Sequence, residues 1–251
     1  MDTPLLHLPS TTSTNEDAYG LARKGAVHGC GVLADTQSGG RGRLGREWLS
    51  PPGSGLYCSI ILRPRLPFTD FPKLTLTAGL AVCRVIETLV PHAPFGLKWP
   101  NDLYCRGCKA GGILVESSSP VESDDNIFVI VGIGLNVNSR KSDLKTVVNR
   151  TPTSLYLESG EVYDIEELYQ AIHISLMRHV KLHEEEGLAV ILEEWRKRDL
   201  LLGIEMQWLT HDRKVITGVG LGPDDSGQLL ARDSGGTIHQ ILSGDVTMAG
   251  S

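Results

Sequence analysis

Residues 37–48 read QSGGRGRLGREW, and we expect the rest of the chain to hold this stretch in place. Three arginines, Arg41, Arg43 and Arg46, lie within six residues among four glycines, and only Glu47 opposes their charge. Two guanidinium groups about 6 Å apart repel each other by roughly 3 kcal/mol at an effective dielectric constant of about 20. Because guanidinium groups pair with carboxylate and phosphate oxygens, and glycine lets a backbone approach a ligand closely, the stretch predicts an anion-binding loop.

Strand-like segments flank the loop, with Gly31–Asp35 leading into it and Leu56–Leu62 leading out. Residues 40–45 also match the dinucleotide fingerprint G-x-G-x-x-G, but that motif requires a helix directly afterwards. The sequence SPPGSG at residues 50–55 cannot continue a helix, so we reject this match. A solvated basic loop and a nucleic-acid contact remain as alternatives for the stretch taken alone.

The composition is that of an ordinary globular protein, with 41% hydrophobic and 22% charged residues among 251. The net charge of −6 and the pI near 5.7 argue against general affinity for DNA or for an anionic membrane. The N-terminus has no basic region followed by an apolar stretch, so we expect a cytoplasmic protein. The longest apolar run, Ile127–Leu135, is half a membrane span and reads as a buried strand. An odd number of cysteines, five, favours reduced thiols.

Up to about residue 200 the pattern alternates strands and helices, and after residue 203 it changes to short strands. The first part is expected to contain a strand at Leu5–Leu8, a helix from the Ser10–Asn15 cluster to about Lys24, a core helix at Leu74–Val90, strand-like runs Phe95–Trp99 and Ile113–Glu116 around a turn-rich middle, a buried strand at 126–137, a polar loop at 138–153 and a helix at Asp164–Trp195 interrupted near Gly187. The second part is expected to contain strands at Glu205–Leu209, Val215–Val219, Leu229–Arg232, Ile238–Leu242 and Val246–Met248, which suggest a small β-barrel.

Three motif matches are better explained by structure than by chemistry. Asp233–Gly236 reads as a turn between short strands, not as a protease nucleophile loop. Cys105 and Cys108 have zinc-ligand spacing but no second pair, so an incidental hairpin is favoured. His179 and His183 precede three glutamates, and we expect a solvent-exposed helix face there.

Two further fragments combine side chains suited to binding phosphates. Lys98-Trp99-Pro100-Asn101-Asp102 places a cation, an aromatic ring, an amide and a carboxylate at the end of a strand. Lys109-Ala110-Gly111-Gly112 places a lysine beside a backbone that a ligand can approach, and the two glycines lead us to expect an exposed loop at Lys109. A capped strand end is the alternative for the first fragment, and a helix cap is the alternative for the cluster Ser13-Thr14-Asn15.

Taken in order, these fragments resemble the biotin protein ligases. The motifs that carry the resemblance are Ser13-Thr14-Asn15, Gln37-x-x-Gly40-Arg41-Gly42-Arg43-x-Gly45-Arg46, Lys98 to Asp102, Lys109-x-x-Gly112-Ile113-Leu114-x-Glu116 and Gly132-Ile133-Gly134-Leu135-Asn136-Val137. The resemblance covers roughly residues 5–200 and, more loosely, the C-terminal part. It implies an α/β (α+β) fold with a mixed-sheet catalytic domain at 1–200, helices on one side of the sheet, and a small β-barrel domain at 203–251.

The resemblance also implies the reaction and its participants. The enzyme is expected to make biotinyl-5'-adenylate from biotin and ATP with magnesium, and then to transfer biotin to a lysine of a biotin carboxyl carrier protein of acetyl-CoA carboxylase or a related carboxylase. A homodimer is a further family expectation. Because only twelve residues precede Ser13, the DNA-binding domain of regulatory members is expected to be absent.

The resemblance assigns roles to particular residues. Biotin binding is expected from Ser13, Thr14, Asn15, Gln37, Gly40, Arg41, Lys109 and Gly112. ATP or adenylate binding is expected from Arg43, Arg46, Trp48, Lys98, Asn101, Lys109 and Asn136. Lys109, Arg43 and Asp102 are the expected catalytic residues, and Asp102 is also the candidate metal ligand and proton acceptor. The sequence departs from the family at Ala110-Gly111, so packing behind Lys109 is expected to differ. A lipoate ligase of similar fold is the rival enzyme, and a nucleic-acid-binding module that uses the arginine loop is the rival of another class.

Overall fold

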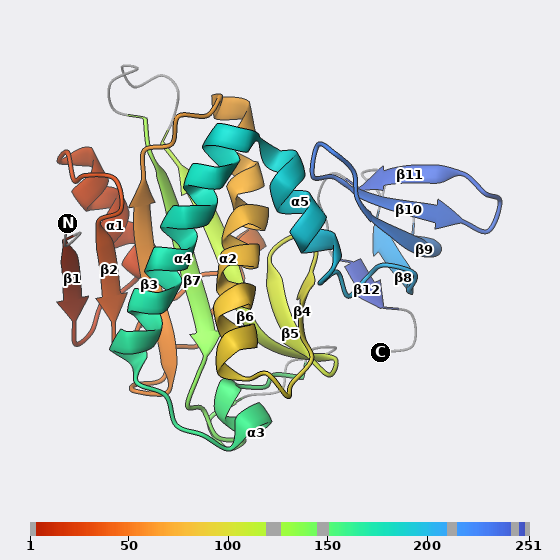
Figure 1. Cartoon of the computed structure of the whole chain (residues 1–251). Helices are drawn as coiled ribbons and strands as arrows, with labels where there is room; N and C mark the ends of the chain where they lie inside the picture. Colours follow the sequence, from red (N-terminus) through yellow and green to blue (C-terminus); the bar gives the residue numbers. More distant parts are fainter. Residues whose placement is uncertain (1–3, 119–126, 145–150, 210–214, 242–245, 249–251) are drawn as a thin grey trace.

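The chain folds into a large mixed α/β part and a small C-terminal β part (Figure 1). This computed structural model describes residues 4–118, 127–144, 151–209, 215–241 and 246–248. The predicted fold class, a mixed sheet with helices followed by a small β unit, is confirmed. In the described residues no helix is long and apolar enough to cross a membrane.

A seven-stranded sheet forms the centre of the large part, in the order β1-β2-β3-β7-β6-β5-β4. Only β1 and β2 pair in parallel; every other neighbouring pair is antiparallel. The strands are β1 (Leu5–Leu8), β2 (Gly31–Ala34), β3 (Gly55–Leu62), β4 (Phe95–Lys98), β5 (Asp102–Cys105), β6 (Cys108–Ser117) and β7 (Val129–Asn136). The buried runs of β3 and β7 are central because side chains on both of their faces are covered.

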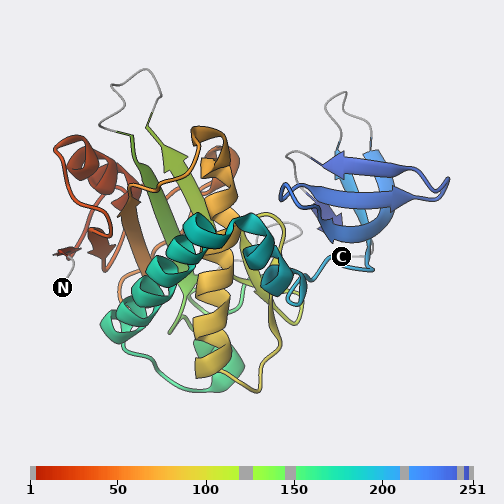
Figure 2. The ribbon, with the colours of Figure 1, turned by 45° about the horizontal axis from the view of Figure 1, so that its top comes forward.

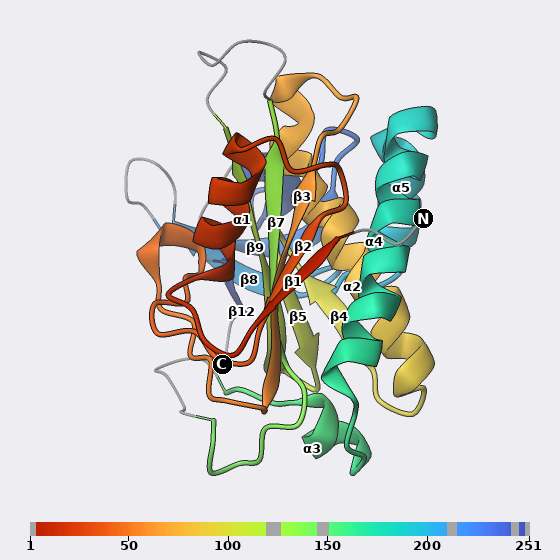
Figure 3. The same cartoon turned by 90° about the vertical axis from the view of Figure 1, so that its left-hand side faces the viewer.

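Three helices cover one face of the sheet and a fourth covers the other (Figure 3). The first group is α2 (Leu74–Leu89), α4 (Ile165–Glu186) and α5 (Leu188–Arg196), and the fourth is α1 (Thr14–Arg23). Because successive strand residues point to opposite faces, Ile60 packs in the cluster beneath α2 and α4, whereas Ile61 packs with Ala18 beneath α1. The prediction that the helices lie on one side of the sheet is therefore wrong for α1, which covers the opposite face. A short helix, α3 (Leu155–Ser159), follows the polar loop and was not predicted.

The C-terminal part, drawn in blue in Figure 2, is a sheet. It has five antiparallel strands in the order β11-β10-β9-β8-β12. Its strands are β8 (Glu205–Leu209), β9 (Val215–Pro223), β10 (Leu229–Asp233), β11 (Ile238–Ile241) and β12 (Val246–Met248). Met206 and Leu229 belong to the same buried cluster as Leu76 and Trp195, so the two parts share apolar packing. The division into domains at residues 200–203 stays a prediction.

Most predicted elements agree with the structure to within a few residues. The clearest miss is β5, because residues 102–105 were read as part of a turn-rich middle; they form a hairpin with β6. The helix break at Gly187 is confirmed, with φ at 83°. Residue 126, residues 145–150 and residue 242, which belong to predicted segments, lie outside the described residues.

The structure also shows what each of the three discounted motif matches forms. Asp233 accepts hydrogen bonds from the backbone N–H groups of Gly235 and Thr237, as a turn requires. Cys105 and Cys108 are paired neighbours in the β5–β6 hairpin, and all five cysteines are free thiols. The expectation of an exposed face is wrong for His183, which is 2% exposed and hydrogen-bonded to the Thr77 hydroxyl.

Candidate active site

A single cavity of about 220 Å³ brings the predicted site residues together. It is lined by side chains from the start of α1, the loop before β3, the β4–β5 turn, β6 and β7. Its lining includes Ser13, Thr14, Asn15, Gln37, Arg41, Arg43, Arg46, Trp48, Lys98, Asn101, Asp102, Lys109, Gly112 and Asn136. Residues more than a hundred positions apart in the sequence thus surround one space, as the resemblance implied.

Gly40 does not line the cavity in the described residues, but it shapes the loop that does. The Trp48 N–H donates to the Gly40 carbonyl at 2.8 Å, so the two ends of the arginine loop lie against each other. A Cβ atom at position 40 would be 2.5 Å from the Trp48 carbonyl oxygen and 3.0 Å from the Ser50 hydroxyl. Only glycine permits this close return of the chain.

Uncharged polar groups form one side of the site. Gln37 Oε1 accepts from both the backbone N–H and the hydroxyl of Thr14, at 2.9 and 3.1 Å. Gln37 Nε2 donates to the Ser50 hydroxyl at 2.9 Å, which fixes the orientation of the amide. Ser13 occupies the N-cap position of α1 without a side-chain capping bond, so the capping alternative does not explain its hydroxyl.

Three contributing residues, Ser50, Ser59 and Glu116, received no role from the sequence. Ser59 lies within hydrogen-bond distance of Thr14 and Asn15, and Glu116 accepts from the Asn15 amide. These three residues form hydrogen bonds with side chains that line the cavity, but they are not among the described residues that line it. Glu116 belongs to a motif that carries the resemblance but was given no role there. No local pattern reports the contacts of the three residues, because their partners lie 13 to 101 positions away.

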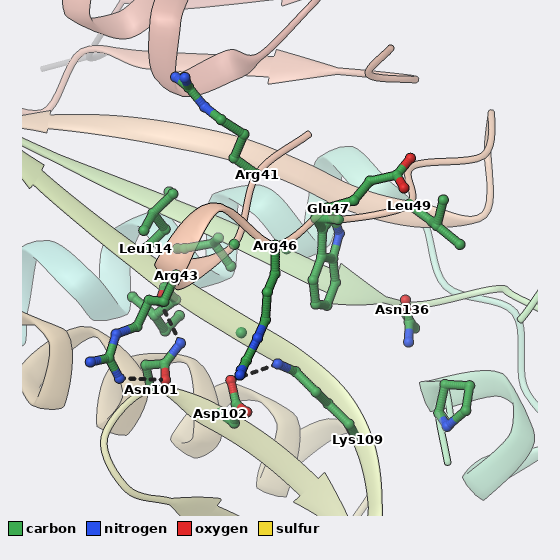
Figure 4. A pocket seen from close by; sticks show the side chains of 18 of the residues that line it. Arg41, Arg43, Arg46, Glu47, Leu49, Asn101, Asp102, Lys109, Leu114 and Asn136 are labelled. Atoms are coloured by element: carbon green, nitrogen blue, oxygen red, sulfur yellow. Dashed lines mark hydrogen bonds and ion pairs between the residues drawn. The ribbon is translucent and has the colours of Figure 1, made fainter. Parts of the chain in front are cut away.

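The three arginines of the loop diverge (Figure 4). Arg41 turns toward α1 and pairs with Glu16 at 3.0 Å, with both side chains about half exposed. Arg43 donates to Asn101 Oδ1 at 3.2 Å, and Arg46 reaches toward Asp102 and Lys109. Burial lowers the pKa of the Arg43 guanidinium from its ordinary value, and the charge of Asp102 opposes this shift. A partly buried cation of this kind favours an anionic ligand.

Lys109 and Asp102 form an ion pair inside the cavity. Lys109 Nζ lies 2.7 Å from Asp102 Oδ1, and each side chain is less than one-fifth exposed. The ammonium group also lies 5.5 Å from the centre of the Trp48 ring. The expectation of an exposed loop position for Lys109 is therefore wrong: the residue belongs to β6, and its backbone exchanges hydrogen bonds with Thr151 and Thr153.

The remaining predicted residues are held by protein contacts. Asn101 Nδ2 donates to the Ile113 carbonyl at 2.9 Å, and Asn136 Nδ2 donates to the Thr153 carbonyl at 2.9 Å. Lys98 Nζ lies over the Tyr104 ring at 5.2 Å. Trp99, which is 6% exposed, donates from Nε1 to the Gly227 carbonyl of the C-terminal sheet at 3.0 Å. These contacts hold the side chains of the cavity wall in place.

The donor set fits a magnesium ion only when that ion arrives with a polyphosphate. Among the described residues no group of three or more His, Cys, Asp or Glu side chains is placed to hold a metal ion. Asp102 is the carboxylate that pairs with Lys109 in the cavity, and Mg²⁺ commonly binds one or two carboxylates together with substrate phosphates.

The cavity has uncharged polar groups on one side and clustered cations on the other, an arrangement suited to a class of enzyme that joins an acid to a nucleotide phosphate. Comparison with known proteins gives the family: residues 8–136 match the biotin/lipoate A/B protein ligase family, to which this chain belongs. The biotin branch is supported over the lipoate branch by the named relatives.

Several relatives match almost the whole chain. The bifunctional ligase/repressor BirA of Bacillus spizizenii is 36% identical over 97% of this chain and 74% of its own length. The biotin–[acetyl-CoA-carboxylase] ligase of Mycobacterium tuberculosis is 31% identical over 94% of this chain and 85% of its own length. The biotin protein ligase of Aquifex aeolicus, solved in complex with biotin and ATP, superposes with a TM-score of 0.84 at 33% identity, with both chains fully covered.

Proposed function

We propose that this chain is an ATP-dependent biotin ligase that makes biotinyl-5'-adenylate and transfers biotin to a lysine of a biotin carboxyl carrier protein. The observation that carries the proposal is the cavity itself, where the Thr14–Gln37 group adjoins Lys109, Arg43 and Arg46. Biotin has a neutral ring system at one end and a carboxylate at the other, and ATP brings phosphates. The side chains around the cavity match both chemistries.

In the first step a biotin carboxylate oxygen attacks the α-phosphorus of ATP, a P–O bond to the β-phosphate breaks, and pyrophosphate leaves. Two anions must approach each other, so the step is limited by charge repulsion. Lys109, with Arg43 and Arg46, supplies fixed positive charge where negative charge develops. Trp48 provides an aromatic face for adenine, and Asn101 and Lys98 support the phosphate side of the site.

In the second step the amine of the carrier lysine attacks the carbonyl carbon of the mixed anhydride, the acyl C–O bond breaks, and AMP leaves. No covalent intermediate with the enzyme is needed. The amine must lose a proton, and Asp102 is the carboxylate that lines the cavity beside Lys109 and is proposed to accept it. A magnesium ion bound to ATP would offset phosphate charge, with Asp102 as its protein ligand.

The cellular setting follows from the same proposal. Free ATP and carboxylases are found in the cytoplasm, and the acceptor is the carrier protein of acetyl-CoA carboxylase or a related carboxylase. Homodimer formation remains a proposal based on the family. The nucleic-acid alternative is disfavoured because Arg41 pairs with Glu16, and Arg43 and Arg46 turn toward the cavity instead of forming one exposed basic surface.

The test is to incubate the purified chain with ATP, magnesium and biotin, to remove free small molecules by gel filtration, and then to analyse the protein fraction by mass spectrometry. Retained biotinyl-adenylate is expected. ATP–pyrophosphate exchange measured with biotin and with lipoate separates the two ligase alternatives, and only biotin is expected to support exchange. Exchange that requires lipoate, or DNA binding that weakens steeply with salt and no exchange with either acid, would overturn the proposal.

A further inference from the structure

The amide of Asn15 sits in a slot built by three adjacent strands. Its Oδ1 lies 2.6 Å from the Ser59 hydroxyl on β3, and its Nδ2 lies 2.6 Å from Glu116 Oε2 on β6. Gly132 on β7 forms the floor between them: a Cβ atom there would be 2.2 Å from Asn15 Oδ1. Asn15 is 6% exposed and lines the cavity.

Ser59 does not by itself decide which way this amide points. Its hydroxyl carries one hydrogen but lies within reach of two acceptors, Asn15 Oδ1 at 2.6 Å and Thr14 Oγ1 at 2.8 Å. The Thr14 hydroxyl hydrogen is already directed to Gln37 Oε1, so Thr14 can only accept from Ser59. Because a hydroxyl also accepts hydrogen bonds, Ser59 would tolerate either orientation of the Asn15 amide.

Glu116 is the group that distinguishes the two orientations. An ionised carboxylate only accepts hydrogen bonds, so a flipped amide would set Asn15 Oδ1 against a carboxylate oxygen. We infer that Glu116, which is not part of the described cavity lining, is a positioning residue that holds the Asn15 amide in one orientation for the biotin ring. This inference rests on the proposed function.

The orientation matters for a ligand of this chemistry. The ureido ring of biotin carries N–H donors next to a carbonyl acceptor. A fixed Asn15 amide presents its remaining N–H and its oxygen at set positions, and a flipped amide exchanges donor for acceptor. The mismatch would leave buried polar groups without partners, which costs more than the loss of a hydrogen bond exposed to water.

The diagnostic substitution is Glu116→Gln, which keeps the size of the side chain. A glutamine amide can donate as well as accept, so both orientations of Asn15 become possible. Isothermal titration of the full chain should show biotin bound at least about twofold more weakly, because only the chains whose Asn15 amide keeps its original orientation are competent to bind it. The affinity for ATP and the melting temperature should stay at the wild-type values.

Three controls separate positioning from a general structural role. Glu87→Gln disrupts a partly buried carboxylate that pairs with Arg198 on the far side of the sheet, and should leave biotin affinity unchanged. The double variant Asn15→Ala with Glu116→Gln should bind biotin no more weakly than Asn15→Ala alone. Asn15→Asp with Glu116→Gln keeps a hydrogen bond between the two positions but with reversed polarity, so the melting temperature should again match the wild type while biotin affinity stays low.

Several outcomes would overturn the inference. They are unchanged biotin affinity in Glu116→Gln, equal losses for biotin and ATP, or additive effects of the Asn15 and Glu116 substitutions. If the wild-type chain binds no biotin, the proposed function fails together with this inference. If the wild type binds biotin and Glu116→Gln binds it equally well, only the positioning role fails.

Discussion

Lys109 Nζ and Asp102 Oδ1 lie 2.7 Å apart on neighbouring strands of the seven-stranded sheet, and both residues line the cavity. Gly112, directly opposite Asp102 in the register, leaves room for both groups; a Cβ atom there would be 3.3 Å from Asp102 Oδ1 and 3.4 Å from Lys109 Nζ. The ion pair keeps the ammonium charge inside the site. An anionic ligand would compete with Asp102 for that charge.

We predict that Lys109→Ala lowers ATP–pyrophosphate exchange by two to three orders of magnitude, because one fixed donor at developing charge is worth about 3 to 4 kcal/mol. The substitution also leaves Asp102 without its partner, so some loss of stability is expected. Lys109→Gln is the matched control: it retains a donor for Asp102 without the charge. Exchange should fall equally in both variants, and activity within tenfold of the wild type in either one would refute the role.

Much of the fold could be predicted because its elements are locally patterned. The strands at Leu5–Leu8 and Glu205–Leu209 agree with the sequence prediction residue for residue. The convergence of Ser13, Lys109 and Asn136 on one cavity could not be obtained from periodicity and came from the resemblance alone.

The errors have physical causes. Gly111 and Gly112 were read as signs of a loop at Lys109, yet they lie within β6, where Gly111 allows close packing: a Cβ atom there would be 2.9 Å from the Gly134 carbonyl oxygen. Glu116 binds Asn15 across 101 positions, and no local pattern reports such a contact. The strand β5 lies between Pro100-Asn101 and Gly107, and these turn-forming residues on both sides led to its being read as part of a turn.

The arginine loop is expected to be a lid that keeps water from the adenylate. Arg43 joins the loop to β6 through Asn101, whose Nδ2 binds the Ile113 carbonyl. Arg43→Gly removes this link, so adenylate should still form but dissociate faster, and lysines on bystander proteins should become biotinylated. The measurement is biotin incorporation into serum albumin together with the rate of adenylate release.

Asn101→Leu tests the same link from the other side, because it removes the acceptor of the Arg43 hydrogen bond. Asn101→Leu should also raise the rate of adenylate release, by a smaller factor than Arg43→Gly. Unchanged release and no albumin labelling in both variants would show that the loop is not a lid.

Asp199, after α5, should make stability depend on pH. Burial raises its pKa to about 6, with the Leu201 N–H acting in the opposite direction, and its Oδ2 is buried with no hydrogen-bond partner in the described residues. This pKa lies above the unfolded value of about 3.9. The folded state therefore binds the proton more tightly, and the cost of the ionised carboxylate is present above about pH 6 and disappears as the pH falls toward 4.

Asp199→Asn removes this ionisation while keeping an acceptor for the Leu201 N–H. The variant should melt a few degrees above the wild type at pH 8, and the difference should shrink toward pH 4.5. Asp225→Asn, at a side chain that is 92% exposed, is the control and should show no such trend. A constant difference across this pH range would rule out the effect.

The C-terminal sheet is expected to help bind ATP or the carrier protein. Trp99 connects this sheet to the cavity through a hydrogen bond. Trp99 Nε1 donates to the Gly227 carbonyl from a position next to Pro100, which lines the cavity. Deleting residues 203–251 would expose Leu76 and other buried residues of the shared core, so a point substitution is the cleaner test.

Trp99→Phe removes one hydrogen bond of about 1 kcal/mol while keeping an aromatic ring, and should raise the KM for ATP or for the carrier about fivefold. Biotin affinity should stay unchanged. Trp195→Phe is the matched control, because the Trp195 indole N–H is buried and has no partner in the described residues. If Trp99→Phe and Trp195→Phe change the KM for ATP, the KM for the carrier and the affinity for biotin by similar factors, the C-terminal sheet contributes stability and not catalysis or docking.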